Sequence, residues 1–121
     1  MIINNKLQLQ DVQSIVENLS KIEISEDSKT AITDCYCFLE SFSNDKVIYG
    51  INTGFGPMAQ WRIDDDHLKE LQYYIIRSHS TGAGEPLPIE CVRAAMLARL
   101  MTFMQAHSGV NMQTCELLVE F

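Results

Sequence analysis

The feature that most constrains how this 121-residue chain can fold is a glycine-rich segment at residues 47–59. It opens with a short apolar, strand-like run, continues with Tyr49, and then places three glycines within seven residues, Gly50, Gly54 and Gly56. Because glycine has no Cβ, such a segment bends sharply or lets another group approach closely. We therefore expect a long loop over residues 47–63, in the middle of the chain.

On both sides of this loop, apolar residues recur at helical spacing. Capping residues and breakers predict helices that start at Asp11, Ser25, Asp64–Asp66, Pro88 and Asn111, the second running to about Phe42 and the fourth to about Ala106. The alternation of Ile22-Glu23-Ile24 predicts one short strand. The chain is therefore predicted to be a single, mainly α domain over residues 1–121, with at most one or two short strands.

Composition limits the possible partners and location. The formal net charge is -7 and there is no basic cluster, so a nucleic-acid footprint is missing. No apolar run approaches the roughly 20 residues that span a bilayer, and the N-terminus lacks a signal-peptide layout. The cysteines at 35, 37, 91 and 115 lack zinc or redox spacing, which favours reduced thiols. We expect a cytoplasmic protein with no membrane or nucleic-acid partner.

The last helix shows no stop signal before the chain ends at Glu120-Phe121. A helix end more often carries glycine or a basic last turn, and glutamate is mildly unfavourable at the negative end of the helix dipole. We expect that the natural reading frame continues or that this is an excised piece. The alternative is a C-terminal helix that packs on its own core.

Two kinds of chemistry find little support in the residue pattern. Residues 54–59 match the G-x-G-x-x-G/A nucleotide fingerprint formally, but an irregular stretch follows where the fingerprint requires a helix. His67, His79 and His107 share no metal-ligand spacing, so no metal is expected. His79 differs from the other two because it lies where a helix meets a glycine-rich break. It is either a capping or core histidine or a ligand-facing imidazole.

Tyr49 is a candidate acid–base group. A free tyrosine has a pKa of about 10, so a catalytic tyrosine base needs nearby positive charge to lower its pKa. Arg62 and Arg77 are possible sources of that charge. An ordinary packed aromatic ring is the alternative, and composition does not choose between the two.

Several ordered motifs together resemble the aromatic amino acid ammonia-lyases, the family of the histidine, phenylalanine and tyrosine lyases. VIYGINTGFG at 47–56 looks like the family's signature loop, and RSHSTGAGEPL at 77–87 is similar to a second family segment. Leu71-Gln72, Val92–Ala95, Ser108–Val110 and Leu9–Val16 fit the same family. The resemblance covers nearly all of the chain and implies the N-terminal helical domain of such an enzyme.

The resemblance implies a mechanism. These enzymes are mainly α-helical homotetramers that eliminate ammonia from an α-amino acid, and a tyrosine on a mobile loop removes a β-proton. By resemblance that catalytic tyrosine is Tyr49. The lid loop that carries it would comprise Gly50, Asn52, Thr53, Gly54, Phe55 and Gly56. We expect residues 50–62 to be mobile, or unusually placed, when the neighbouring parts of the enzyme are missing.

Ser78 and His79 fall at the family's substrate-selecting pair. Histidine lyases commonly carry Ser-His there, whereas many tyrosine lyases carry His-Leu and phenylalanine lyases Phe-Leu. The pair therefore favours a histidine ammonia-lyase, which converts histidine to urocanate. Some bacterial members that prefer tyrosine also keep Ser-His, so tyrosine remains open as a substrate.

One departure from the family is severe. The family's electrophile, 4-methylidene-imidazol-5-one, forms from an internal Ala-Ser-Gly, and this sequence contains no Ala-Ser-Gly. We expect the chain to be inactive alone, with the cofactor supplied by the rest of a full-length enzyme. Its expected partners are the amino acid substrate and either a second copy or the remaining lyase polypeptide. The alternatives are a tyrosine ammonia-lyase fragment or a non-catalytic accessory or remnant protein.

Overall fold

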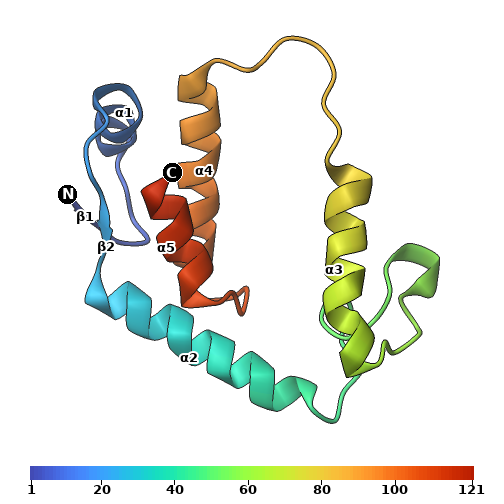
Figure 1. Ribbon diagram of the computed structural model, residues 1–121. Helices are drawn as coiled ribbons and strands as arrows, with labels where there is room; N and C mark the ends of the chain where they lie inside the picture. Colours follow the sequence, from blue (N-terminus) through green and yellow to red (C-terminus); the bar gives the residue numbers. More distant parts are fainter. The chain divides into compact units, whose positions relative to one another are not determined.

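A computed structural model describes the backbone of residues 1–121 and every side chain except that of residue 65. The described chain is mainly helical, as predicted, with two very short strands. Its elements are β1 (Ile2–Ile3), α1 (Leu9–Asn18), β2 (Glu23–Ile24), α2 (Glu26–Ser43), the 3₁₀ helix η1 (Gly56–Met58), α3 (Asp65–His79), α4 (Ile89–Phe103) and α5 (Met112–Glu120) (Figure 1). None of the described helices is long and apolar enough to cross a membrane.

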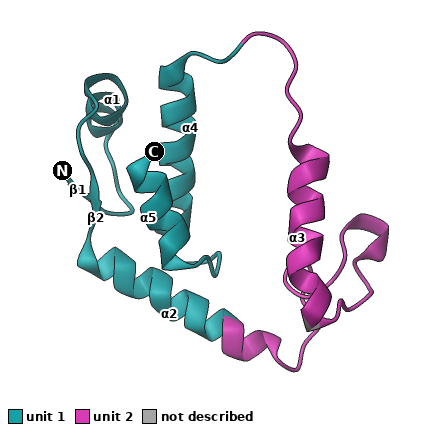
Figure 2. Ribbon diagram, in the orientation of Figure 1, with its two compact units in different colours: residues 1–39, 86–121 teal, residues 40–85 magenta. Residues whose placement is uncertain are grey.

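The chain divides into two compact units (Figure 2). Unit 1 comprises residues 1–39 and 86–121, and unit 2 comprises residues 40–85. The glycine-rich loop and α3 therefore share a unit, whereas the two chain ends lie in the other. The expectation of one domain over residues 1–121 stays a prediction.

In unit 1, β1 and β2 form a parallel pair that aligns Ile2 with Glu23 and Ile3 with Ile24. The alternation at 22–24 predicted β2. Nothing in the sequence predicted β1, because two residues are too few to show a period. Ile3 and Ile24 are both buried, so the pair joins the N-terminus to the core.

The first helix begins earlier than predicted. Gln8, not Asp11, is the N-cap of α1, and Asp11 occupies the third helical position. The Gln8 backbone N–H donates to Asp11 Oδ2 at 2.9 Å. An acid reaching back to the cap backbone is one half of a capping box, so Asp11 stabilises the start of the helix from inside it.

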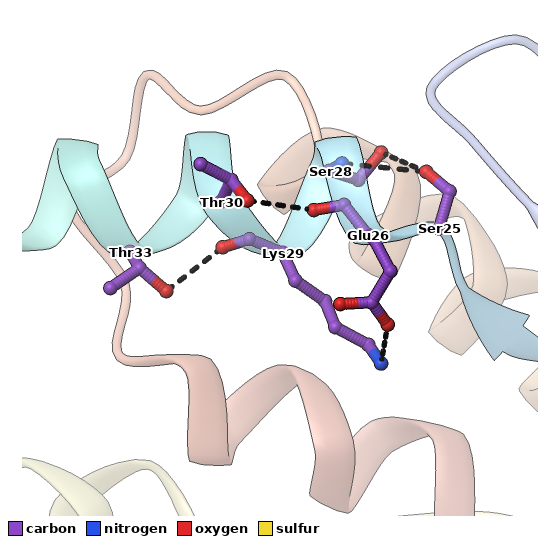
Figure 3. Close-up of polar contacts among 6 residues, drawn as sticks. All are labelled: Ser25, Glu26, Ser28, Lys29, Thr30 and Thr33. Carbon is purple, nitrogen blue, oxygen red and sulfur yellow. Dashed lines mark hydrogen bonds and ion pairs between the residues drawn. The ribbon is translucent and has the colours of Figure 1, made fainter.

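Ser25 caps α2, as predicted (Figure 3). Its Oγ accepts from the Ser28 backbone N–H at 3.4 Å and donates to Ser28 Oγ at 2.9 Å. Lys29 Nζ lies 2.6 Å from Glu26 Oε1, one turn along the same helix. The first turn of α2 is thus stabilised by local polar contacts, and Ile32, one turn beyond Ser28 on the same face, is buried in the core.

The apolar stripe that runs along α4 to its C-cap, Met104, forms core. Leu97, Leu100 and Met104 are buried in unit 1. The helix ends at Phe103, short of the predicted Ala106, because Ala106 adopts a left-handed φ of 55°. Asn111 caps α5 as predicted, since its side chain accepts from the Gln113 backbone N–H at 2.9 Å.

In unit 2, Asp64 is the N-cap of α3, as predicted, and the helix ends before the Ser80–Pro86 break. Val47 and Ile48, the apolar run that opens the loop, lie in irregular chain after α2 and form no strand, in line with the loop predicted over residues 47–63. Two apolar residues with no partner strand cannot build a ladder. The loop is closed instead by an isolated antiparallel bridge between Thr53 and Arg62.

Candidate functional site

Tyr49 stands on the outside of the glycine-rich loop. Its side chain is 62% exposed. One edge of its ring meets Phe55, with centroids 5.9 Å apart and planes at 67°, which is a favourable edge-to-face arrangement. The phenol is therefore displayed to solvent while Phe55 supports its ring.

Asn52 holds the loop in shape from inside. Its side-chain amide donates to the carbonyl oxygens of Lys46 at 2.7 Å and Ser43 at 3.2 Å. Its Oδ1 accepts from the Ile48 backbone N–H at 2.8 Å. Asn52 is only 5% exposed, so these bonds replace water and fix the turn that precedes Tyr49.

Thr53 and Gly54 complete this scaffold. Thr53 is 1% exposed, and its Oγ1 donates to the Gly54 carbonyl at 2.9 Å and accepts from the Gly50 N–H at 3.4 Å. A Cβ on Gly54 would lie 2.6 Å from Met58 Cβ and 2.8 Å from the Met58 carbonyl oxygen. Only glycine fits there. The interior of the loop is thus polar and closely packed, and its exterior carries the tyrosine.

Ser78 and His79 are the last two residues of α3. His79 Nδ1 lies 2.9 Å from both the Ile75 carbonyl oxygen and Ser78 Oγ, and Ser78 Oγ donates to the same carbonyl at 2.9 Å. A carbonyl oxygen only accepts, whereas a hydroxyl can donate or accept, so Nδ1 either donates to the Ile75 carbonyl or accepts from Ser78 Oγ. The side chain of His79 is exposed.

The structure does not bring the tyrosine and the Ser-His pair into contact. The loop is bonded to the start of α3, where the Ile63 N–H donates to the Asn52 carbonyl at 3.0 Å. His79 lies at the other end of that helix, about 20 Å away at 1.5 Å per residue. Among the described residues, no hydrogen bond or ring contact joins Tyr49 to Ser78 or His79.

The two arginines considered as sources of positive charge for Tyr49 contact other groups. An Arg62 guanidinium nitrogen donates to the Asn44 carbonyl at 3.5 Å. Arg77 lies over the Tyr73 ring, 5.9 Å from its centroid. Neither contact involves Tyr49, so any cation that activates it has to come from outside these pairs.

The structure does not provide the context for a dinucleotide site either. The G-x-G segment follows a turn, not a strand, and leads into the three-residue helix η1. Too few N–H groups are aligned there for a pyrophosphate, which binds at the start of a long helix. In the described part of the chain, no three His, Cys, Asp or Glu side chains are grouped so that they could hold a metal ion.

The residue pattern missed one polar pair on α3. The Tyr74 hydroxyl donates to a Glu70 carboxylate oxygen, and this hydrogen bond raises the pKa of Tyr74. The i, i+4 spacing of the two residues was the available signal. The hydrogen bond thus favours the protonated phenol of Tyr74.

Comparisons with known proteins identify the family of this chain. The model of the aromatic amino acid lyase family matches residues 7–121. The histidine ammonia-lyase of Deinococcus radiodurans is 38% identical over 120 residues, which are 98% of this chain and 23% of that protein. The histidine ammonia-lyase of Myxococcus xanthus is 34% identical over 121 residues, 99% of this chain and 24% of that protein.

Solved structures share the fold. An ergothionase from Treponema denticola superposes with a TM-score of 0.93 at 28% identity, over all of this chain and 25% of that one. The histidine ammonia-lyase of Trypanosoma cruzi gives 0.84 at 32% identity, over 98% of this chain and 24% of that one. The chain therefore belongs to the aromatic amino acid lyase family. It spans about a quarter of the length of the relatives that it matches.

Proposed function

We propose that this chain is the tyrosine-bearing part of a histidine ammonia-lyase-like enzyme, in which Tyr49 is the base that removes a β-proton from the substrate. The observation that carries the proposal is the loop itself. An exposed phenol stands on a scaffold whose interior is fixed by Asn52, Thr53 and Gly54. The curated histidine ammonia-lyases, 34–38% identical over nearly the whole chain, support the choice of reaction.

Ser78 and His79 are proposed to bind the side chain of the substrate. With Nδ1 bonded to the Ile75 carbonyl, His79 offers Nε2 as an acceptor. An imidazole N–H of histidine is a matching donor. Neither Ser78 nor His79 contacts Tyr49, so the proposed site needs other polypeptide, or a second copy, to complete it around the substrate.

The family's electrophile cannot form within this chain. That group supplies the chemistry that turns the substrate amine into a good leaving group, and it is made from Ala-Ser-Gly, which this sequence does not contain. The proposed contribution of this chain is therefore proton removal and substrate binding. We expect the purified 121-residue chain to release no ammonia from histidine, tyrosine or phenylalanine.

A chimera tests the catalytic role. This chain would replace the matching portion of the Deinococcus radiodurans histidine ammonia-lyase, and urocanate formation would be followed by its absorbance. Tyr49→Phe should lower kcat by about 10²–10⁴-fold, the usual contribution of a general base. Tyr73→Phe, which removes an exposed phenol on α3, is the matched control and should leave kcat within about twofold. Equal rates for Tyr49→Phe and the parent chimera would refute the assignment.

Tyrosine is the second candidate substrate, because the proposed contact with His79 suits a phenol as well as an imidazole. The His79 Nε2 acceptor would accept from a phenol O–H as readily as from an imidazole N–H. The ratio of kcat/KM for histidine to that for tyrosine in the chimera decides between the two. A ratio above one supports histidine, and His79→Ala should lower kcat/KM for whichever substrate is preferred.

A further inference from the structure

Three polar atoms meet at the C-terminal end of α3. They are the Ile75 carbonyl oxygen, Ser78 Oγ and His79 Nδ1, and each of the three distances between them is 2.9 Å. The carbonyl carries no hydrogen, the hydroxyl carries one, and Nδ1 of a neutral imidazole carries one or none. The three contacts therefore share at most two hydrogens, so the direction of the Ser78 hydroxyl and the tautomer of His79 depend on each other.

Two arrangements are possible for a neutral His79. In the first, the Ser78 hydroxyl donates to the Ile75 carbonyl, and Nδ1 carries a hydrogen that points to the same carbonyl and to Ser78 Oγ. Every contact then joins a donor to an acceptor.

In the second arrangement, Nδ1 carries no hydrogen and the Ser78 hydroxyl turns away from the carbonyl to donate to it. The Ile75 carbonyl then loses its donor and faces the lone pair of Nδ1 at 2.9 Å. Two acceptors at that distance repel each other, because no hydrogen lies between them. The first arrangement is therefore favoured.

The neighbouring serine bonds a different carbonyl. A serine three residues after a helical carbonyl can donate back to it, and Ser78 has this spacing from Ile75. The backbone N–H and the hydroxyl of Ser80 both donate to the Ile76 carbonyl. The hydrogen bonds that the structure describes for Ser80 thus do not involve the imidazole, whereas Ser78 Oγ contacts His79 Nδ1 directly.

The favoured arrangement leaves Nε2 of His79 without a hydrogen, on an exposed side chain. Nε2 is then an acceptor, which matches an aromatic ring that carries an N–H or O–H donor. An imidazole and a phenol meet this requirement, and a phenyl ring does not. If the Ser78 hydroxyl is removed, Nδ1 keeps one of its two acceptors, so the tautomer with the hydrogen on Nε2 becomes more populated.

We propose that Ser78 is a positioning residue that acts through His79. Its hydroxyl, directed to the Ile75 carbonyl, keeps the hydrogen of His79 on Nδ1. Nε2 then accepts from the substrate and selects amino acids whose ring carries an N–H or O–H. The inference rests on the proposed function in one respect, that His79 faces the side chain of the substrate.

Nitrogen-15 NMR of the 121-residue chain tests the tautomer without any catalysis. Long-range proton–nitrogen spectra distinguish the two neutral forms, and His79→Gln identifies the signals of His79 among those of the three histidines. At about pH 8.5, about two units above the usual pKa of a free imidazole, His79 should carry its hydrogen mainly on Nδ1. Ser78→Ala should raise the ratio of the Nε2–H to the Nδ1–H form about fivefold, within the effect of one hydrogen bond. Ser78→Thr, which keeps the hydroxyl, and Ser80→Ala, the matched control, should keep the parent ratio.

Substrate selection is tested in the Deinococcus chimera. Ser78→Ala should lower kcat/KM for histidine about fivefold, because Nε2 then accepts less often. The inhibition constant of phenylalanine should stay within about twofold, since a phenyl ring has no hydrogen to donate. A general loss of structure would weaken both together. Ser78→Thr and Ser80→Ala should keep the parent selection for histidine over phenylalanine.

The outcomes separate this inference from the proposed function. A parent chain with the hydrogen of His79 mainly on Nε2, or an unchanged tautomer ratio in Ser78→Ala, overturns the inference whether or not the chimera is active. A tautomer that shifts as expected without a change in selection overturns it as well. If tautomer and selection both behave as expected but Tyr49→Phe reacts at the parent rate, the catalytic assignment alone is overturned. Should the chimera not accumulate, the tautomer measurement decides.

Discussion

At the scale of single residues, Asn52 determines whether Tyr49 is presented at all. Asn52→Ala would remove three hydrogen bonds and leave the carbonyls of Lys46 and Ser43 without their donor. An unsatisfied buried polar group costs about 1–3 kcal/mol, so unit 2 should lose stability by about that amount. Faster hydrogen exchange of the Ile63 amide measures the loss. Gln60→Ala, on the exposed side of the same loop, should leave that exchange rate unchanged.

The close approach of Met58 to Gly54 predicts that any side chain at position 54 destabilises the loop. Its replacement by alanine places a methyl group against the Met58 carbonyl and Cβ, and backbone must move to relieve the contact. We expect Gly54→Ala to destabilise the loop by about 1–3 kcal/mol and to weaken the bond from its N–H to the Trp61 carbonyl. Gly82→Ala is the control, because nothing lies within 4 Å of a Cβ built there. Trp61 fluorescence reports the change, and equal spectra for both variants would contradict it.

Cys115 differs from the other three cysteines because it is buried. Burial raises the pKa of its thiol, and the neighbouring Glu116 adds to the shift. The folded state therefore favours the protonated thiol. Its stabilising contribution is full below the unfolded pKa of about 8.5 and is lost as pH rises through the folded pKa. At pH 8 we expect iodoacetamide to modify Cys115 at least tenfold more slowly than Cys37, with the difference abolished in urea.

At the scale of elements, the start of α2 allows the stabilising effect of a helix cap, Ser25, to be compared with that of a surface ion pair, Glu26 with Lys29. Ser25→Ala removes the side-chain acceptor for the Ser28 N–H and should cost about 1 kcal/mol in the free energy of unfolding. Glu26→Gln removes the ion pair to Lys29, whose pKa that carboxylate raises. Both groups face water, so Glu26→Gln should have little effect. Urea unfolding followed by circular dichroism checks the order, and a larger effect for Glu26→Gln would contradict it.

The same elements show which parts of the fold could be predicted from the sequence. Ser25, Asp64 and Asn111 predicted helix starts correctly. Ser25 and Asn111 act through side-chain bonds within their own first turn, whereas the Asp64 side chain makes no such bond. The prediction that α1 starts at Asp11 was wrong, because an acid stabilises a helix equally well at the cap or inside the first turn. Neither β1 nor the Asn52 network could be predicted. Both depend on partners that only folding brings together, such as Ile3 with Ile24 and Asn52 with Ser43.

In the candidate site, too, the sequence predicted the residues but not how they lie relative to one another. The loop composition singled out Tyr49 and its glycines, and the helix break singled out Ser78 and His79. The contact of His79 Nδ1 with the Ile75 carbonyl, four residues back in the same helix, is local geometry. The spatial relation of the two parts of the site was beyond the sequence, since a loop and a helix end are placed by packing and not by spacing.

At the scale of the whole molecule, the two units are built on different interiors. The eight buried apolar residues that form the described core, Ile3, Val16, Ile24, Ile32, Leu97, Leu100, Met104 and Cys115, all belong to unit 1. The side chains buried in unit 2 belong to Asn52 and Thr53, which are polar. Apolar burial is the main source of stability, so unit 2 should open at a lower free energy than unit 1.

This difference gives a test of whether residues 1–121 behave as one domain. The Ser25 amide, bonded to the Ile3 carbonyl, reports on unit 1, and the Ile63 amide reports on unit 2. If the units open independently, Ile63 should exchange at least tenfold faster than Ser25. Leu100→Ala, which empties part of the core at a cost of about 2–5 kcal/mol, should then accelerate Ser25 alone, and Asn52→Ala should accelerate Ile63 alone. Equal acceleration of both amides by either variant would instead establish one cooperative domain, with the tyrosine loop as stable as the core that anchors the chain.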